Sequence, residues 1–552
     1  MTRAIRSSPV GHRLPRVGPD APGVGTGRLK ARALMLGILV LTMACGPSGL
    51  GGPQATGVPP TVGPIALPTA KPRPTIVVTV PATQELPQED LAGQAEAMVM
   101  ENVGDIDQFP GATRYAIKAS VTFNADEGRA RIEGQARILF TNPLDRPLDD
   151  LVLMLWPNDA QYRSSMQANA ALIDGIGLSP QVELDGIALR YLLPESLAPG
   201  ETLDASLPFE VEATGPIGGS DPKRFGITDG MLAAPTFYPL VPRLVDDAWQ
   251  VEPAPPGGDT TNSETALYDL AIRAPGDLAL AVSGIEVERS ENPDGTQTVH
   301  VVTGPMRDVA FALGPMETTS VQVAQVELRA WYLPEHADSA QEMLEAAQVQ
   351  YEALTDRVGP YPYPQLDLVD APGAFGGIEY PGLVFIGTLG GTNVIEPTVH
   401  EVAHQWFYGL IGDDQLHEPW LDEGAATYAE VLYYEAAGRS GRATGMLSDL
   451  RAWLRSHPDP TLPIGLGVGE YADQGEYALF VYVKGALFFD ALRRELGDAA
   501  FTEFLHLYYQ TFRYRVADGA AFQDLAQDTC GCDLTSLFDL WVWQGGRIPS
   551  LP

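Results

Sequence analysis

The first half of the chain alternates apolar and polar residues with a period of two. Residues 115–123 read YAIKASVTF and residues 131–140 read RIEGQARILF, and both are rich in residues that favour β-strands. Turn-forming sequences, NADEG and NPLDRP, follow these two runs. The pattern continues over 265–275 and 296–313. We therefore predict an all-β, sandwich-like domain over residues 110–318, with no chemistry of its own.

From about residue 319 the pattern becomes mainly helical. Residues 326–333 and 366–373 read as strands, and residues 337–359 have the composition of a helix that ends at Gly359 and Pro360. Further helical segments are predicted around 477–497, 500–513, 518–528 and 534–543. The sequence thus predicts a multidomain α+β protein, in which a mainly α domain over 319–552 follows the β domain.

The N-terminus resembles a targeting segment. Three basic residues precede the apolar run ALMLGILVLTMA at 33–44, which is typical of a secretory signal and shorter than the roughly 20 residues of a membrane span. We assign 1–44 as a signal peptide. Cys45 directly after Ala44 resembles a bacterial lipoprotein signal, which predicts an extracytoplasmic protein anchored to the cell membrane through lipidated Cys45. Simple secretion and an uncleaved anchor are the alternatives.

Composition narrows the remaining possibilities. Residues 45–109 begin with a stretch dense in Pro, Gly, Thr and Ala, which reads as an extended tether. A hydrophobic fraction of 45% is ample for a core, and a net charge of −36 argues against nucleic acid as a partner. No obligate protein partner is inferred. Cys530 and Cys532 flank one glycine, and both a disulfide and two thiols are compatible with that spacing.

Two histidines stand four residues apart in PTVHEVAHQW, at 397–406. On a helix, His400 and His404 lie on one face, where a single zinc ion takes both imidazoles. Pro397 suits the first turn of such a helix. Glu401 lies on an adjacent part of the face and reaches a metal-bound water without being a ligand. A chance match on an amphipathic helix is the alternative for the pentapeptide alone.

A third ligand is available downstream. Residues 418–435, EPWLDEGAATYAEVLYYE, have a helical pattern, and Glu423 follows His404 with 18 residues between them. Two histidines and one carboxylate leave the fourth tetrahedral position open, which is the catalytic arrangement of zinc. We predict one Zn²⁺ per chain. Thr427 and Glu430 follow Glu423 at helical spacing, so they either orient the ligands or are solvated helix residues.

Three blocks together resemble a known family, the gluzincin aminopeptidases related to aminopeptidase N and the leukotriene epoxide hydrolase. The first is the zinc signature with WLDEGAATY. The second, GGIEYPGLVF at 376–385, is similar to the family's Gly-x-Met-Glu-Asn motif, with Ile378 and Tyr380 as departures. The third, VYVKGALFF at 481–489, is similar to its Tyr-x-Lys-Gly motif. The resemblance covers 110–550 and implies a short, two-domain member of lipoprotein type with a thermolysin-like catalytic domain.

The resemblance also implies roles for single residues. Zinc held by the three ligands lowers the pKa of its water and polarises the scissile carbonyl. Glu401 acts as general base and then general acid. Tyr482 stabilises the oxyanion by a hydrogen bond. The alternative is that Tyr482, like Tyr477 in the same aromatic-rich segment, is an ordinary core residue.

Glu379 is the residue that would make the enzyme an exopeptidase. Its carboxylate would pair with the substrate's α-ammonium, while Gly376 and Gly377 let the backbone lie close to the peptide. The implied function is an aminopeptidase acting on peptides with a free N-terminus. An endopeptidase or another zinc hydrolase on the same site is one alternative. A non-catalytic binding scaffold is the other, although it predicts decayed catalytic residues, whereas Glu401 and the three ligands are present.

Overall fold

The structure, a computed structural model, describes residues 92–215, 224–256, 258, 262–371, 376–387 and 393–548. The predicted signal peptide, Cys45 and the predicted tether as far as residue 91 lie outside the described residues. Among the helices of the described residues, none is both long enough and apolar enough to cross a membrane.

The alternating segments form a large sheet in the first half of the chain. The predicted strands at 115–123 and 131–140 are confirmed as β1 (Thr113–Asn124) and β2 (Arg129–Thr141). Alternate residues of β1 are buried, as expected for a strand with one face on a core. Strands follow the order β16-β17-β14-β1-β2-β9-β5-β6, with β4 also on β9, and only the β1–β14 pair is parallel among these described strands. The other strands are β4 (Ser164–Ala168), β5 (Ala171–Ile173), β6 (Ile176–Leu178), β9 (Thr202–Thr214), β14 (Ala266–Pro275), β16 (Ile285–Glu291) and β17 (Thr296–Val302).

Smaller sheets complete the β-rich half and connect it to the helical half. A three-stranded sheet has the order β3-β8-β7, a four-stranded sheet has the order β10-β11-β18-β15, and β12 pairs with β13. These strands are β3 (Leu148–Met154), β7 (Gln181–Glu183), β8 (Ala188–Leu197), β10 (Gly226–Thr228), β11 (Met231–Pro235), β12 (Leu244–Val245), β13 (Ala248–Trp249), β15 (Ala279–Val282) and β18 (Ala310–Gly314).

The helical half is built on a sheet of its own. Its order is β19-β20-β21-β23-β22, with β20, β21 and β23 parallel to one another and the short β22 antiparallel at an edge. The strands are β19 (Glu317–Val323), β20 (Val326–Tyr332), β21 (Gln365–Ala371), β22 (Gly377–Ile378) and β23 (Leu383–Gly387). The predicted domain boundary at 318/319 therefore falls inside β19.

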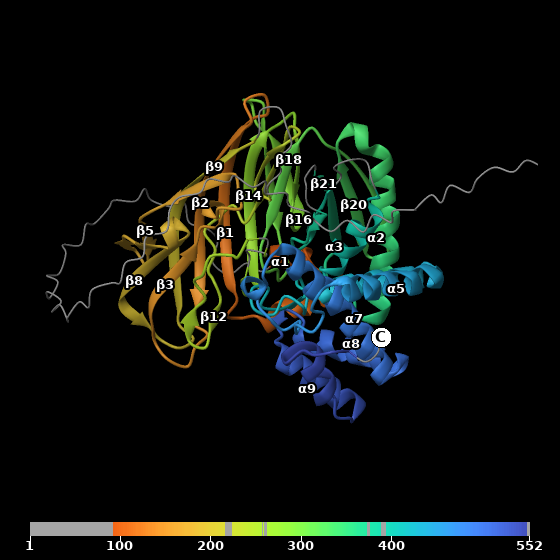
Figure 1. Cartoon of the computed structure of the whole chain (residues 1–552). Helices are drawn as coiled ribbons and strands as arrows, with labels where there is room; N and C mark the ends of the chain where they lie inside the picture. The colour runs from red at the N-terminus through yellow and green to blue at the C-terminus, as the bar shows by residue number, and fades with distance from the viewer. Residues whose placement is uncertain are drawn as a thin grey trace, which may run out of the picture. The chain divides into compact units, whose positions relative to one another are not determined.

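Helices cover this sheet and extend beyond it. The predicted helix at 337–359 is confirmed as α2 (Ala337–Arg357), which runs beside β20 and β21 (Figure 1). The segments predicted after residue 475 are helical as well. The remaining helices are α3 (Ile395–Ala403), α4 (Glu423–Ala436), α5 (Ser440–Ser456), α6 (Gln474–Tyr477), the π-helical segment Ala478–Lys484, α7 (Gly485–Leu496), α8 (Asp498–Phe512), α9 (Gly519–Cys530), α10 (Thr535–Phe538) and the π-helical segment Asp539–Trp543, with the short pair β24 (Ile411–Gly412) and β25 (Arg515–Val516). The predicted α+β class, β-rich first and helical afterwards, is confirmed.

An apolar cluster joins the two halves. Ala310 and Ala312 of β18 belong to one buried group with Trp331 of β20 and Phe385 of β23. Residues of the four-stranded and five-stranded sheets thus share one buried cluster, so the two sheets pack against each other. This packing fixes β22, at the edge of the five-stranded sheet, relative to the β-rich half.

The predicted tether is too long at its C-terminal end. Residues 92–108 form α1 (Ala92–Glu96) and the 3₁₀ helix Met100–Gln108. Met98 and Ile106 are buried in the main core, and Asp105 forms an ion pair with Arg513 at 2.9 Å. Burial of these apolar side chains and the ion pair to α8's C-terminal end hold the segment on the folded domain, which a residue composition averaged over 45–109 conceals.

A buried arginine ties the β-rich half to the helical half. The guanidinium of Arg307, 2% exposed, donates to the carbonyl oxygens of Ser263 at 3.1 Å, Tyr408 at 2.8 Å and Arg515 at 2.6 Å. Asp413 lies close enough to interact electrostatically with this arginine, yet among the described residues neither of its buried carboxylate oxygens has a hydrogen-bond partner. Burial, reinforced by the charge of Asp414, raises the pKa of Asp413 well above its ordinary value.

Replacing Asp413 with asparagine is expected to flatten the pH dependence of stability. A carboxyl whose pKa is raised in the folded state keeps its proton when the unfolded chain has lost it, so its contribution to stability falls as the pH rises above about 4. Asp413→Asn should therefore match the wild type near pH 4 and exceed it at pH 8 by at least ~1 kcal/mol, the worth of less than one pKa unit. Urea unfolding at both pH values measures this. A variant equally destabilised at both would mean that the buried carboxyl carries no such cost.

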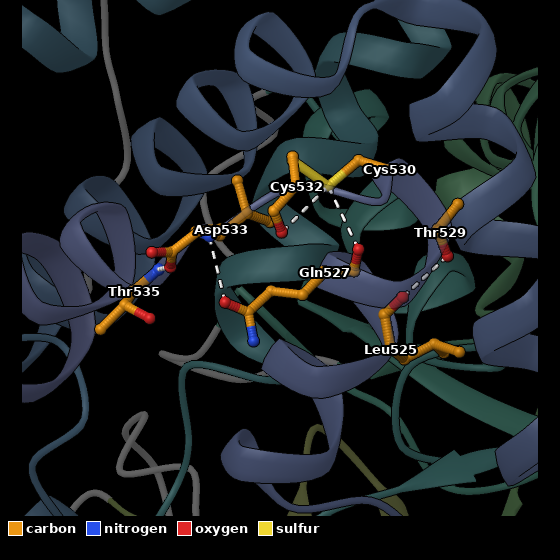
Figure 2. The surroundings of a disulfide bond; sticks show 8 residues. Leu525, Gln527, Thr529, Cys530, Cys532, Asp533 and Thr535 are labelled. Carbon is orange, nitrogen blue, oxygen red and sulfur yellow. Dashed lines mark hydrogen bonds between the residues drawn. A yellow bond between two sulfur atoms is a disulfide. The ribbon is translucent and has the colours of Figure 1, made fainter.

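The two C-terminal cysteines form a disulfide. Cys530 is the last residue of α9 and forms a disulfide with Cys532 (Figure 2). Gly531, between them, adopts the left-handed conformation with φ +60°. A glycine reaches this conformation without a steric cost and ends the helix there. Of the two states that the spacing allows, the structure therefore has the disulfide.

Candidate active site

Three side chains from two helices meet at one point. His400 lies on α3, His404 directly follows its last residue, and Glu423 is the first residue of α4. The Nε2 atoms of the histidines are 3.1 Å apart, and they lie 3.0 Å (His400) and 3.2 Å (His404) from Glu423 Oε2. Ligand atoms around a tetrahedral zinc with bonds of about 2.0–2.1 Å are separated by roughly 3.3 Å. The triangle therefore has the size that one such ion requires.

The other ring nitrogens show which atoms face the centre of this triangle. Nδ1 of His404 lies 3.1 Å from the carbonyl oxygen of Phe407, which only accepts, so this nitrogen carries the proton. Nδ1 of His400 lies 3.3 Å from Glu430 Oε1 and is the donor for the same reason. In the neutral rings both Nε2 lone pairs therefore point at Glu423. Three converging acceptors repel one another unless a cation lies between them, so the donor set fits Zn²⁺.

Protons compete with a metal for these atoms. Burial lowers the pKa of His404, but the charge and hydrogen bond of Glu423 outweigh it and raise that pKa to about 10. The same balance, with hydrogen bonds to Glu423 and Glu430, raises the pKa of His400 well above its ordinary value. For Glu423, burial is outweighed by the two imidazoles, which lower its pKa.

Sequence reasoning left the roles of Thr427 and Glu430 open. Glu430 contacts His400 and fixes its proton on Nδ1, so it orients a ligand. The hydroxyl of Thr427 is buried and has no hydrogen-bond partner among the described residues. It therefore orients neither ligand.

The helical pattern predicted over 418–435 begins only at Glu423, since Pro419 and the residues up to Asp422 form turns.

Glu401 lies against the edge of the sheet. It follows His400 on α3 and is 5% exposed. A Cβ atom placed on Gly377 would come within 2.2 Å of Glu401 Cγ and 2.4 Å of its Oε1. Only glycine leaves room for the Glu401 side chain at this position of β22. Gly377 therefore serves the proposed base directly, in addition to the peptide approach that the sequence predicts for it.

Tyr482 reaches the same centre from the π-helical segment. Its hydroxyl donates to Glu423 Oε1, and its ring stacks on the His400 ring with centroids 5.8 Å apart and planes 13° apart. Tyr477 is 3% exposed and packs edge-on against Tyr482 and Tyr471. Of the two tyrosines, Tyr482 carries its hydroxyl to the site and Tyr477 packs in the core. π-Helical turns inside longer helices occur often at functional sites.

Substituting Tyr482 with phenylalanine is expected to lower kcat by about 10²-fold with a smaller change in KM. The ring that stacks on His400 is retained, so the loss reports the hydroxyl, which acts mainly in the transition state. Steady-state kinetics with matched zinc content measures the effect, and Tyr477→Phe is the control. If Tyr477→Phe loses activity and Tyr482→Phe does not, the assignment of Tyr482 as the oxyanion donor is wrong.

Glu379 follows β22 and lies beside His404, one of the proposed zinc ligands. It is 6% exposed, and one of its carboxylate oxygens, a nitrogen of His404 and an oxygen of Asp422 lie within 4.8 Å of one another. Gln415 donates to Glu379 Oε1 at 3.1 Å. The Glu379 carboxylate is thus close enough to His400, His404 and Glu423 for a single amino-acid residue of a substrate to lie between them. Gly376 O accepts a hydrogen bond from Gly387 N, so the adjoining backbone is held at the sheet edge.

The departure at Tyr380 is explained by packing. The Tyr380 ring is 5% exposed, belongs to the apolar cluster between the two sheets and lies edge-on to Phe385 with centroids 5.4 Å apart. Ile378 is buried in the same cluster. Both departures from the family motif therefore contribute core side chains.

Two glutamines around Glu379 have no counterpart in the sequence prediction. Gln405 donates to the carbonyl oxygens of Glu379 and Tyr380 and accepts from Gly382 N, and Gln415 bridges Glu379 and Asp422. Gln405 directly follows His404, but its position alone does not show that its side chain turns toward β22. Gln415 lies between short turns with no periodicity.

Comparison with known proteins agrees with this geometry. Residues 336–541 match the model of the peptidase family M1 domain. Human aminopeptidase B is 29% identical over 272 residues, and leucine aminopeptidase 2 of Yarrowia lipolytica is 27% identical over 296 residues. These matches cover 44% and 49% of this chain, which spans only 40% and 43% of the relatives' length.

Solved structures share the fold over a longer range. The M1 zinc metallopeptidase of Deinococcus radiodurans has a TM-score of 0.60 and 23% identity, over 79% of this chain and 95% of that one. A mutant of that protein bound to a Tyr-Ser-Ala substrate has the same TM-score. The fold is that of a two-domain M1 metallopeptidase, and the predicted resemblance to the gluzincin aminopeptidases is confirmed. The family implies a zinc cofactor, as the donor set does.

Proposed function

We propose that the protein is a zinc-dependent aminopeptidase that removes N-terminal residues from peptides. The observation that carries this proposal is the placement of one buried carboxylate, Glu379, beside a complete set of zinc ligands. A carboxylate at this position pairs with a cationic N-terminus and leaves the first peptide bond at the metal. The names of the relatives, aminopeptidases, and the peptide-bound neighbour support the same substrate class.

Each side chain has a defined task in this proposal. His400, His404 and Glu423 hold Zn²⁺, which when bound supplies a Lewis acid for the scissile carbonyl and for water. Glu401 takes a proton from the attacking water and delivers it to the leaving amine. Tyr482 donates its hydroxyl hydrogen to the developing oxyanion. Glu379 holds the α-ammonium, and the edge of β22 offers backbone groups to an extended peptide.

A panel of substrates tests the proposal. Aminoacyl fluorogenic substrates with free amines are compared with their N-acetylated counterparts and with internally quenched peptides, each with and without a chelator. The proposal predicts chelator-sensitive cleavage of free-amine substrates and little cleavage of blocked ones. Equal cleavage of both classes indicates an endopeptidase on the same site. Cleavage of neither by zinc-loaded protein indicates another bond or a binding scaffold.

We also propose that the catalytic domain is extracytoplasmic and tethered to the cell membrane through lipidated Cys45. The proposal rests on the sequence of residues 28–45 alone: a basic stretch, a 12-residue apolar run and a cysteine directly after Ala44. Metabolic labelling with a fatty acid tests it in the host, with Cys45→Ser as the control. Label on the wild type that is absent from the variant supports lipidation, and an unlabelled wild type leaves secretion or an uncleaved anchor.

A further inference from the structure

One buried amide connects the proposed amine anchor to the turn that places a zinc ligand. Gln415, 3% exposed, lies between β24 and α4. Its Nε2 is 3.1 Å from Glu379 Oε1 and 3.1 Å from Asp422 Oδ2. The two hydrogens of a single amide group thus serve two carboxylates that lie 43 positions apart along the chain.

Asp422 fixes which end of the amide faces Glu379. A glutamine side chain has one donating and one accepting end, and carboxylates only accept. With two carboxylates on the same side, the flipped amide would place its oxygen against both, so the donating end is held toward them. Asp422 is itself fixed, because it is 1% exposed and its Oδ1 accepts the backbone N–H of Glu423 at 2.6 Å.

The backbone of Glu379 is tied to the other zinc-bearing helix. Gln405 donates to the carbonyl oxygens of Glu379 at 3.4 Å and Tyr380 at 3.3 Å. Its Oε1 accepts from Gly382 N at 2.8 Å. Gln405, which follows His404 in the chain, therefore holds the backbone of Glu379 by hydrogen bonds. The carboxylate of Glu379 is connected to the backbone of Glu423 by hydrogen bonds through Gln415 and Asp422.

The cluster formed by Glu379, His404 and Asp422 is unsuited to a second metal ion. Glu379, His404 and Asp422 each bring a ligand-type atom within 4.8 Å of the others. However, Nδ1 of His404 carries a proton toward Phe407 O, and its Nε2 points at His400 and Glu423. His404 therefore has no nitrogen for a second ion. The carboxylates suit an organic cation that lies next to the first metal.

We propose that Gln415 is a positioning residue that, held by Asp422, aims the Glu379 carboxylate at the α-ammonium of the substrate and so sets the selectivity for free N-termini. The inference rests on the proposed aminopeptidase function. Gln415 contacts Glu379, and Asp422 contacts Gln415, so both are placed to act through the Glu379 carboxylate. Asp422 also caps α4, the helix that begins with Glu423. The segment from Gln415 to Glu423 therefore positions both the Glu379 carboxylate and one proposed zinc ligand.

A double-mutant cycle tests this inference. Gln415→Met keeps the length of the side chain but removes its donor, and it is expected to lower kcat/KM on a free-amine substrate by ~10-fold, the scale of one hydrogen bond to a charged group, mainly through KM. On the N-acetylated substrate it should change little. In a Glu379→Ala background it should cost nothing further, because the group it positions is gone.

Gln350 provides a matched control. It is a fully buried glutamine on α2 whose Nε2 donates to the carbonyl oxygen of Ala429 at 3.3 Å, away from Glu379. Gln350→Met should lower stability without changing the ratio of kcat/KM between free-amine and acetylated substrates. Zinc content is measured for every variant. Asp422→Asn retains a good helix cap and should reproduce the selectivity loss of Gln415→Met. It replaces Gln415→Met in the test if Gln415→Met does not fold.

The outcomes separate this inference from the proposed function. Loss of the free-amine preference in Gln415→Met, absent in the Glu379→Ala background, supports it. Equal losses on both substrates, or a full loss added to that of Glu379→Ala, overturn it and give Gln415 a purely structural role. If Glu379→Ala loses the preference and neither Gln415→Met nor Asp422→Asn does, this inference fails and the aminopeptidase proposal stands. A wild type without any preference contradicts the aminopeptidase proposal itself.

Discussion

Replacing Glu401 with glutamine is expected to lower kcat by roughly 10²- to 10⁴-fold, the usual worth of a general base. Glutamine has the same shape, so it fits the space over Gly377 that the structure reserves for this side chain. It cannot take a proton from water at neutral pH. Because Glu401 is outside the ligand triad, the variant should still bind one zinc per chain, and its KM should change far less than its kcat.

A second glutamate on the same helix supplies the control for Glu401→Gln. Glu396 accepts hydrogen bonds from Tyr434 at 2.6 Å and Arg442 at 3.2 Å, away from the triad. Glu396→Gln should remain within a few-fold of the wild type, since a partly exposed ion pair contributes little. Single-turnover kinetics with matched zinc content measures the chemical step for both variants. Near-normal turnover in Glu401→Gln would assign the base to another residue.

Removal of zinc is expected to abolish activity, and one equivalent of Zn²⁺ should restore it. The reason is that two Nε2 atoms and one carboxylate oxygen converge within 3.2 Å of one another on the position proposed for the ion, which would supply the Lewis acid of the reaction. Metal analysis should find one zinc per chain. Well-folded protein without stoichiometric metal, yet active, would contradict the assignment.

The same centre predicts a pH dependence of zinc affinity. In metal-free protein the pKa of His404 is raised to about 10 and that of His400 is also raised, so protons compete with zinc for the ring nitrogens. Zinc must displace these protons, and its affinity should therefore fall as the pH is lowered from 9 to 6. Titration calorimetry in two buffers of different ionisation enthalpy measures the protons released. No release at pH 7 would mean that the rings are already neutral.

Much of the fold follows from local patterns in the sequence. The strands β1 and β2 and the helix α2 are predicted within a few residues, because each buries one face and its apolar positions repeat with the period of its backbone. The grouping of the three proposed zinc ligands is predictable for a similar reason. Two of them are one helical turn apart, and the third begins the next long helix.

The surroundings of the site depend on contacts between distant segments. Gln405 and Gln415 lie 26 and 36 positions from Glu379, and only the packing of α3 and the turn before α4 against β22 brings their amides to it. The presence of Tyr380 in place of the family motif's asparagine can be explained only once the apolar cluster between the two sheets is known. Likewise, the burial of Met98 and Ile106, which ends the tether earlier than predicted, depends on a surface formed far along the chain.

Glu379→Ala shows whether Glu379 recognises the N-terminus of a peptide. A charge-assisted hydrogen bond in a site largely closed to water is worth roughly 1.5–3 kcal/mol, which corresponds to a factor of about 10 to 100 in kcat/KM. The measurement is kcat/KM of wild type and variant on one free-amine substrate and on its N-acetylated counterpart, with zinc content matched. If Glu379 holds the α-ammonium, we expect that loss on the free-amine substrate alone. Equal losses on both substrates, or no loss on either, would contradict it.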